Sequence, residues 1–490
     1  MRKIRQHRPV RLWLVIIGLG AAVAPAPAQW PADVLQSDGD AGSLGRGWSA
    51  THPGSFDTRG FGLADGPVTG AFDCISLPDG RAAIACEQWT ALDARRARLQ
   101  IVTRVLGERG WAPLASPLDL EPEPIAIEPS MRRTWRRAPL LLGPHRRVQT
   151  LTLTALPTGT LQLTILHASR DNHRHIQAWQ LGPERTWALV LDAVVQLEPG
   201  SQRESALEVA ADGTVYLLSR VILLQPGGPA QFRLSLHRAA NGKLVRLPFD
   251  PPAEQLAHFR PREHARLLVD GPFPVLAWAG IRGGRPAPSG FNAVQYWRWQ
   301  ADRQTWSLLW AEPAEQEQAD RYGLPAAQRP DGLPVWVWNR PLPPEQGSFA
   351  YEPCFVETGP EGPLEQPLPP LRPGTRTDLW GRAARVHYLG HTPVLVSPVV
   401  SRVVRRGVPV PDQHRLHAVA WARVDEAWLL LGGVAYTRRF HGGHDGITAA
   451  RAAVDPRGNA VLVWGNALPI HGPFCLFAAR WTGGWPTAPH

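Results

Sequence analysis

A unit of about sixty residues recurs along nearly the whole sequence. Each unit contains a turn glycine that follows a short apolar segment, and the spacings between successive glycines are 79, 54, 58, 61, 58 and 68 residues. The turn glycines are Gly80, Gly159, Gly213, Gly271, Gly332, Gly390 and Gly458. A repeat of this kind constrains the fold strongly, because each unit must bury its apolar surface against its neighbours.

Each unit has the pattern of four antiparallel strands. The third segment alternates apolar and polar residues, at 98–106, 175–181, 231–238, 293–300, 415–423 and 475–481. The fourth begins at Trp111, Trp187, Trp306, Trp428 and Trp485 in five units and at Leu244 and Leu364 in two. Period-two alternation is typical of half-buried strands, and glycine permits the positive φ of a tight hairpin. The sequence therefore predicts an all-β fold, a seven-bladed β-propeller of four-stranded antiparallel blades over residues 65–490.

The recurrent tryptophans are expected to fill the wedges between neighbouring blades. Trp336 and Trp338 share one face of their strand, so an aromatic platform for sugar rings is the alternative to packing. The segment 29–64 contains Trp48 in a sequence that resembles a fourth strand. We expect it to pair with the edge of the last blade and close the ring, the alternative being a coincidental match.

The first 28 residues have the pattern of a secretory signal peptide. A basic leader precedes the apolar run 12–24, and small residues precede Gln29 as at a cleavage site. No later segment approaches the ~20 apolar residues of a membrane helix. We expect a secreted or periplasmic protein without a transmembrane helix after signal removal, the alternative being an uncleaved N-terminal anchor.

The positive charge of the chain is concentrated in the leader. The formal net charge is +10, but Arg2, Lys3, Arg5, Arg8 and Arg11 lie in the leader. The rest has 47 basic and 42 acidic residues, a net charge of +5 that forms no basic stripe. This distribution argues against a nucleic-acid partner. Nearly all the remaining cations are arginines, whose planar guanidinium suits carboxylate, sulfate or phosphate.

The four cysteines test the strand assignment. Cys74 and Cys86 lie symmetrically about Gly80, so we expect them to face each other across a hairpin and form a disulfide bond, which export permits. Cys354 and Cys475 occupy third strands of the fifth and seventh units, with a whole unit between them. A bridge between these two is incompatible with the predicted blades.

The units resemble those of secreted bacterial seven-bladed β-propellers of the broad sialidase-like kind. The resemblance lies in the order of turn glycine, second strand closing on an aromatic, alternating third strand and tryptophan-led fourth strand. The Asp-box of true sialidases is missing, and neither their arginine triad nor their tyrosine nucleophile can be matched. The resemblance therefore implies the architecture and transfers no catalytic residue.

The resemblance also implies that two sets of loops open on one face around the central channel. These loops join second to third strands and one blade to the next, and they are rich in histidine and arginine. The ligand-binding candidates are Arg170, Arg282, Arg340, Arg405, Arg438 and His471. The catalytic candidates are Asp171, His173, His175, His441, His444 and Asp445.

Two of these loops carry the strongest chemical pattern. His441, His444 and Asp445 lie within five residues, and their side-chain types suit a divalent metal, although no cofactor is predicted. A histidine and a carboxylate facing each other over a channel can also act as base and acid on a glycan. The plainer interpretation is that these side chains are solvated or bonded to turn backbone. None of the spacings matches a known catalytic motif.

Two functions follow, of which the first is favoured. An exported binding or scaffold module would hold an anionic glycan or a protein partner through its arginine- and histidine-rich channel face. The alternative is a carbohydrate-active enzyme, a glycoside hydrolase or polysaccharide lyase, on the same ring. We expect a monomer.

Overall fold

The structure is a computed structural model of the 490-residue chain. It describes residues 48–50, 68–92, 96–120, 125–126, 147–168, 173–196, 203–223, 231–240, 242–252, 254, 259–282, 293–311, 322–341, 351–359, 362–369, 376–379, 384–405, 408–424, 426–436, 446–455, 459–467 and 474–481. The predicted signal peptide and most of the segment 29–64 lie outside these ranges.

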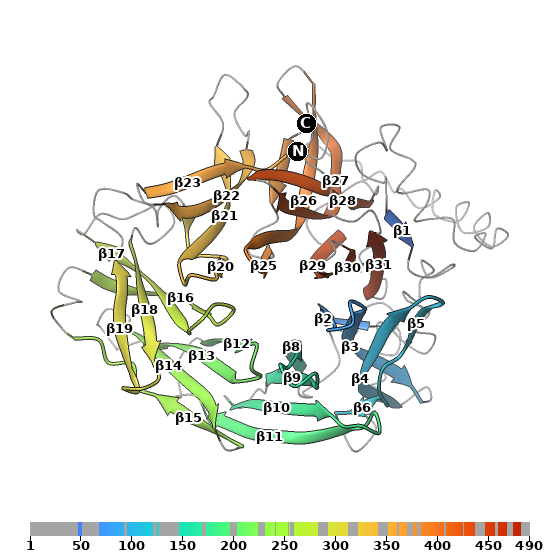
Figure 1. Ribbon diagram of the computed structural model, residues 1–490, viewed down its shortest axis with the longest axis horizontal. Coiled ribbons are helices and arrows are strands. Elements are labelled where there is room, and N and C mark those ends of the chain that lie inside the picture. The colour runs from blue at the N-terminus through green and yellow to red at the C-terminus, as the bar shows by residue number, and fades with distance from the viewer. Residues whose placement is uncertain are drawn as a thin grey trace, which may run out of the picture.

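The strands of the described residues form seven antiparallel sheets arranged in a ring, with almost no helix (Figure 1). The predicted seven-bladed propeller is therefore confirmed. In each blade the first strand of the repeat unit lies nearest the centre of the ring and the later strands lie farther out, with β1 as the outermost strand of blade 7 (Figure 1). No helix in the described part of the chain has the length and apolar character needed to cross a membrane.

The first three blades have the following strands. Blade 1 contains β2 (Val68–Ser76), β3 (Ala82–Ala91), β4 (Arg96–Gly107) and β5 (Gly110–Pro113), and β6 (Leu118–Asp119) and β7 (Ile125–Ala126) also pair with β4. Blade 2 contains β8 (Arg147–Ala155), β9 (Leu161–Ala168), β10 (His173–Leu181) and β11 (Trp187–Gln196). Blade 3 contains β12 (Arg203–Val209), β13 (Val215–Leu223), β14 (Gln231–Ala240) and β15 (Lys243–Leu247).

The other four blades follow the same plan. Blade 4 contains β16 (Phe259–Leu268), β17 (Val275–Arg282), β18 (Ala293–Gln300) and β19 (Thr305–Ala311). Blade 5 contains β20 (Ala327–Gln328), β21 (Pro334–Pro341), β22 (Tyr351–Gly359) and β23 (Gly362–Pro367). Blade 6 contains β24 (Arg376–Leu379), β25 (Arg385–Leu389), β26 (Thr392–Arg405), β27 (Val408–Val424) and β28 (Ala427–Tyr436). Blade 7 contains β29 (Gly446–Val454), β30 (Ala460–Ala467), β31 (Phe474–Trp481) and β1 (Trp48–Ala50).

The core of the molecule lies between blades. Each buried cluster of the described residues combines side chains from two neighbouring sheets, as between blades 3 and 4, where Leu236 packs with Trp278 and Trp297. Trp336 is buried between blades 4 and 5, with its ring edge-on to Tyr296 at 6.3 Å. Trp338 also packs against this cluster. These tryptophans therefore serve packing, in preference to the sugar platform that was the alternative.

Hairpin turns at the inner edge are held by the neighbouring blade. Gly213 has φ +86°, and a Cβ there would lie 2.6 Å from Leu156 Cδ2 in blade 2. The amide of Gln162 donates to the carbonyl of Gly213 at 2.7 Å, which joins the same two blades. At Gly271 no positive φ is involved. A Cβ there would lie 2.2 Å from Gln328 Oε1 of blade 5, so this buried side chain would have to move. Close contact between blades thus constrains the turns as much as backbone conformation does.

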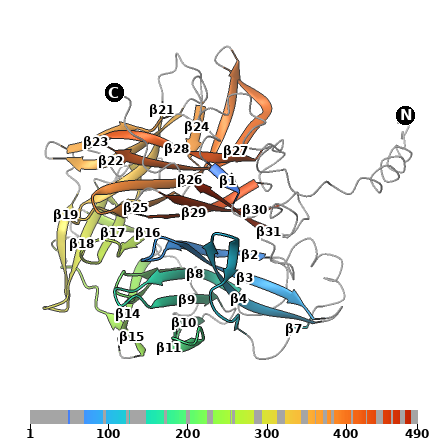
Figure 2. The same ribbon diagram turned by 45° about the vertical axis from the view of Figure 1, so that its right-hand side comes forward.

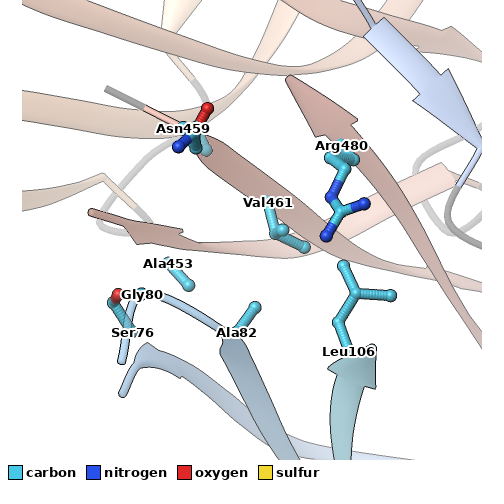
Figure 3. Close-up of a pocket in the computed structure, with 9 residues that line it drawn as sticks. Ser76, Gly80, Ala82, Leu106, Ala453, Asn459, Val461 and Arg480 are labelled. Carbon is cyan, nitrogen blue, oxygen red and sulfur yellow. The ribbon is translucent and has the colours of Figure 1, made fainter. Parts of the chain in front are cut away.

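The fourth strand of blade 7 comes from the N-terminal part of the chain. β1 pairs with β31, with Trp48 opposite Trp481. The residues after 481, including Trp485, lie outside the described part of the chain. A narrow crevice of about 200 Å³ marks the seam between blades 1 and 7, where Arg480 extends toward Leu106 (Figure 3).

The predicted disulfide between Cys74 and Cys86 is wrong. The β2–β3 register places Cys74 opposite Ile84, and Cys86 opposite Phe72, so the two cysteines are diagonal neighbours. Both thiols are reduced and buried. The register follows from the turn, in which Leu77 N donates to Arg81 O at 2.8 Å and centres the hairpin on residue 79 and not 80. Cys354 on β22 and Cys475 on β31 lie on third strands, as expected.

Candidate functional site

Most of the residues predicted from the loops lie outside the described part of the chain. These are Arg170, Asp171, Arg438, His441, His444, Asp445 and His471. Arg282 and Arg405 end strands β17 and β26, and only their backbone is described. Strand β26, which ends at Arg405, forms a hairpin with β27 that extends beyond the other sheets (Figure 2).

His175 is held by a carboxylate that the sequence analysis did not identify. Its Nε2 lies in hydrogen-bond contact with Asp192 Oδ1 on β11, and its ring stacks on His167 with centroids 5.4 Å apart. His173 begins the same strand. His173, His175 and Asp192 lie on the two outer strands of blade 2, and His167 lies on its second strand, β9. Within the described residues, no group of three or more His, Cys, Asp or Glu side chains could hold a metal ion.

Arg340 is engaged within its own blade. Its guanidinium forms ion pairs with Glu352 on β22 and, at 3.5 Å, with Glu365 on β23. The hydroxyl of Tyr322 donates to the same Glu365. Hydrogen bonding to Glu352 raises the pKa of Arg340 above its usual value. This arginine therefore stabilises the packing of blade 5, and its role in ligand binding stays a prediction.

The structure brings a different set of charged residues together at the centre of the ring. The first strands of the blades surround this centre (Figure 1). A cavity of about 390 Å³ opens there between blades 3 to 6. Its polar lining comprises Glu208, Arg220, His264, Arg266, Tyr322 and Arg385. Three guanidinium groups and one glutamate thus line this cavity. We call it the central cavity.

Electrostatic coupling across the ring shows that these first strands converge. The charge of Arg385 acts on residues of blades 1, 3, 4 and 7 as well as its own: Asp73, Glu208, Asp270, Arg451 and His387. Burial raises the pKa of Glu208, and the positive charges of Arg385 and Arg266 oppose that increase. Desolvation therefore outweighs two nearby cations at this carboxyl.

His387 also faces the centre from β25. Desolvation by the surrounding wall, together with the charges of Arg385 and Arg451, lowers its pKa to about 4. The side chain nevertheless retains contact with solvent. His387 is therefore neutral at pH 7 and does not add to the positive charge of the centre.

Asp73 and Arg451 tie blades 1, 2 and 7 together at the opposite side of the ring. Asp73 Oδ2 accepts a hydrogen bond from Leu153 N of blade 2 at 2.9 Å, and its Oδ1 lies 3.6 Å from Arg451 Nε of blade 7. Burial raises the pKa of Asp73 and lowers that of Arg451 to about 10. These contacts have the geometry of a structural link and not of a ligand site.

The sequence contained a signal for the central cavity that the analysis did not use. Glu208, Arg266 and Arg385 each lie five residues before the turn glycine of their unit, at Gly213, Gly271 and Gly390. A charge at the same position in three of the units is unusual for strands that lie at the centre of a fold. Superposing the units on their glycines would have placed these three side chains at the same height on the channel wall.

The similarity of this chain to known proteins is confined to solved structures of low sequence identity. No protein-family model matches the sequence, and no curated protein does so. Among solved structures, an ulvan lyase of a new polysaccharide lyase family matches at 10% identity over 84% of this chain and 93% of that chain, with a TM-score of 0.40. The β-propeller domain of the trilobed protease from Pyrococcus furiosus matches at 9% identity over 86% and 96%, with a TM-score of 0.36. The Trypanosoma rangeli sialidase matches at 10% identity over 86% and 55%, with a TM-score of 0.31.

Proposed function

We propose that this protein is an exported binding module that holds an anionic group of an acidic glycan in the central cavity. The observation that carries the proposal is the convergence of Arg220, Arg266 and Arg385 on one cavity with the single carboxylate Glu208. Guanidinium groups bind carboxylate and sulfate through paired N–H donors, which supports an acidic sugar as ligand. The leader sequence supports export to a secreted or periplasmic location.

The shape of the site favours a glycan over a protein partner. The cavity is concave, and its volume of about 390 Å³ falls in the range of roughly 300–1,000 Å³ found for small-molecule sites. Protein partners usually require a much broader contact surface. A sugar residue with one anionic substituent can enter such a cavity and place that substituent against the arginines.

Isothermal titration calorimetry with tetragalacturonate tests this function. Arg385→Ala should weaken binding at the central cavity by about 1.5–3 kcal/mol, the usual contribution of a hydrogen bond to a charged group. Arg246→Ala is the matched control, because Arg246 is exposed on β15 and does not line the cavity. Binding should also weaken as ionic strength increases. Unchanged affinity in Arg385→Ala would contradict the proposal.

A second candidate is a carbohydrate-active hydrolase or lyase that uses the same cavity. The observation in its favour is that Glu208, His264 and Tyr322, three titratable groups of different type, line the cavity together with the arginines. Catalysis needs such groups to converge on one reacting atom. Incubation with acidic polysaccharides, followed by detection of reducing ends and unsaturated products, distinguishes the two functions. Turnover that Glu208→Gln abolishes while binding persists would establish the enzyme.

A further inference from the structure

A second polar groove lies between blades 3 and 4, at the end of the ring that carries the tight turns. Its volume is about 660 Å³, larger than the central cavity. The lining includes Asp212, Tyr216, Arg238, Phe273, Arg298 and Asp302. The groove and the central cavity share no lining residue, although they adjoin where Tyr216 of the groove pairs with Glu208 of the cavity across β12 and β13.

Arg298 forms a fixed cationic platform in this groove. Its Cζ lies 3.8 Å from the ring centroid of Phe273, in a cation–π contact. The Phe273 ring is held from blade 5, since a Cβ at Gly332 would lie 2.5 Å from its Cζ. The Arg298 side chain is exposed. One face of the guanidinium is therefore covered by an immobilised ring, while the side chain remains accessible from the groove.

A second guanidinium lies on the blade 3 side of the groove. Arg238 hydrogen-bonds to Tyr216, and it opposes the increase that burial causes in the pKa of that tyrosine. Tyr216 is itself buried, so its hydrogen bond restrains the position of the Arg238 side chain. The two arginines thus come from different blades and are both held by aromatic side chains.

The groove also presents hydrogen-bond acceptors. Asp212 Oδ1 accepts from Thr214 N at 2.8 Å, which fixes this carboxylate at the turn. Asp302 is exposed at the rim and lies 3.8 Å from Arg303. Sugar hydroxyl groups can donate hydrogen bonds to such carboxylates, whereas the side chains of an acidic peptide offer no donors. A ligand that carries an anionic group and several hydroxyls matches this combination.

We propose that this groove is a second binding site for an acidic oligosaccharide, with Arg238 and Arg298 holding the anionic substituent and Asp212 accepting from hydroxyls. The site shares no lining residue with the central cavity, so it does not depend on the function proposed for that cavity. Two separated sites on one ring would allow a long acidic glycan to bind at two points and so raise its overall affinity.

Calorimetry on purified protein with tetragalacturonate tests the groove, with maltotetraose as the neutral probe and tetraglutamate as the acidic peptide probe. We expect two sites for tetragalacturonate. Arg298→Ala should weaken one of them by about tenfold or more, and Arg238→Ala should act on the same site. Arg246→Ala is the control, because this exposed arginine of blade 3 does not line the groove.

The variants separate this site from the central cavity. Loss of one site in Arg298→Ala and of the other in Arg385→Ala supports both proposals. An effect of Arg298→Ala with none of Arg385→Ala supports the groove alone. The groove proposal is refuted if Arg298→Ala and Arg238→Ala bind as the wild type does, if tetragalacturonate does not bind, or if maltotetraose or tetraglutamate binds there equally well.

Discussion

Replacement of Asp73 should destabilise the contact between blades 1, 2 and 7. Asp73→Ala removes the acceptor of Leu153 N, a hydrogen bond to a charged group that contributes about 1.5–3 kcal/mol. It also leaves Arg451 without this carboxylate, and breaking a buried pair from one side costs about 3–5 kcal/mol. Both side chains retain some exposure, 16% for Asp73 and 21% for Arg451, which reduces the second effect.

The carboxylate is also partly desolvated, so its removal recovers some free energy. The raised pKa of Asp73 shows that burial outweighs the favourable contacts of the ionised form. We therefore expect Asp73→Ala to lower the free energy of unfolding by about 2–4 kcal/mol. For a chain of this length that corresponds to a decrease of roughly 2–5 °C in Tm.

Urea unfolding followed by tryptophan fluorescence measures this change. Asp79→Ala is the control, because Asp79 lies on the same hairpin but forms an exposed pair with Arg81. It should cost at most about 1 kcal/mol. Equal effects of the two substitutions, or a change below about 0.5 kcal/mol in Asp73→Ala, would refute the role of Asp73 as the link between blades, because surface substitutions typically remain within that limit.

Three further predictions follow from packing and protonation. Gly213→Ala should destabilise more than Gly159→Ala in thermal unfolding, because both glycines have positive φ but only Gly213 has neighbouring side chains within 4 Å; equal effects would contradict the contact between blades. Because the pKa of His387 is lowered in the folded protein, its imidazole is protonated at a higher pH in the unfolded chain than in the folded one. Stability should therefore decrease from about pH 6.5 toward pH 4, and His387→Gln should reduce that slope in urea titrations at each pH; an unchanged slope would argue against it. Cys74 and Cys86 should resist thiol reagents in the native protein and react after unfolding without reductant, since both are buried and burial raises their pKa values; a mass two hydrogens lower for the intact chain would show a bridge instead.

Local patterns determined the blades. Alternation along a strand and glycine at a hairpin are properties of a few neighbouring residues, so the third strands and the tryptophan-led fourth strands were predictable. Leu244 and Leu364 replace tryptophan in two units without altering the prediction. Leu244 packs against the cluster between blades 2 and 3, whereas Leu364 is 54% exposed.

The cysteine pairing shows where local symmetry fails. Counting from Gly80 placed Cys74 opposite Cys86, but the bond from Leu77 N to Arg81 O moves the centre of the hairpin by one residue. The register of a hairpin depends on which backbone atoms of the turn form hydrogen bonds, and the same residue sequence is compatible with several registers. Only the folded hairpin distinguishes them.

Sequence alone thus established the repeat, the strand order within each unit and the propeller that these units build. Tertiary structure decided which charges meet. Glu208, Arg266 and Arg385 lie 58 or more residues apart in the sequence, on β12, β16 and β25. They share a cavity because ring closure places the first strand of every blade against the same central space. A pattern within one repeat unit does not predict which strands of other units lie across that space.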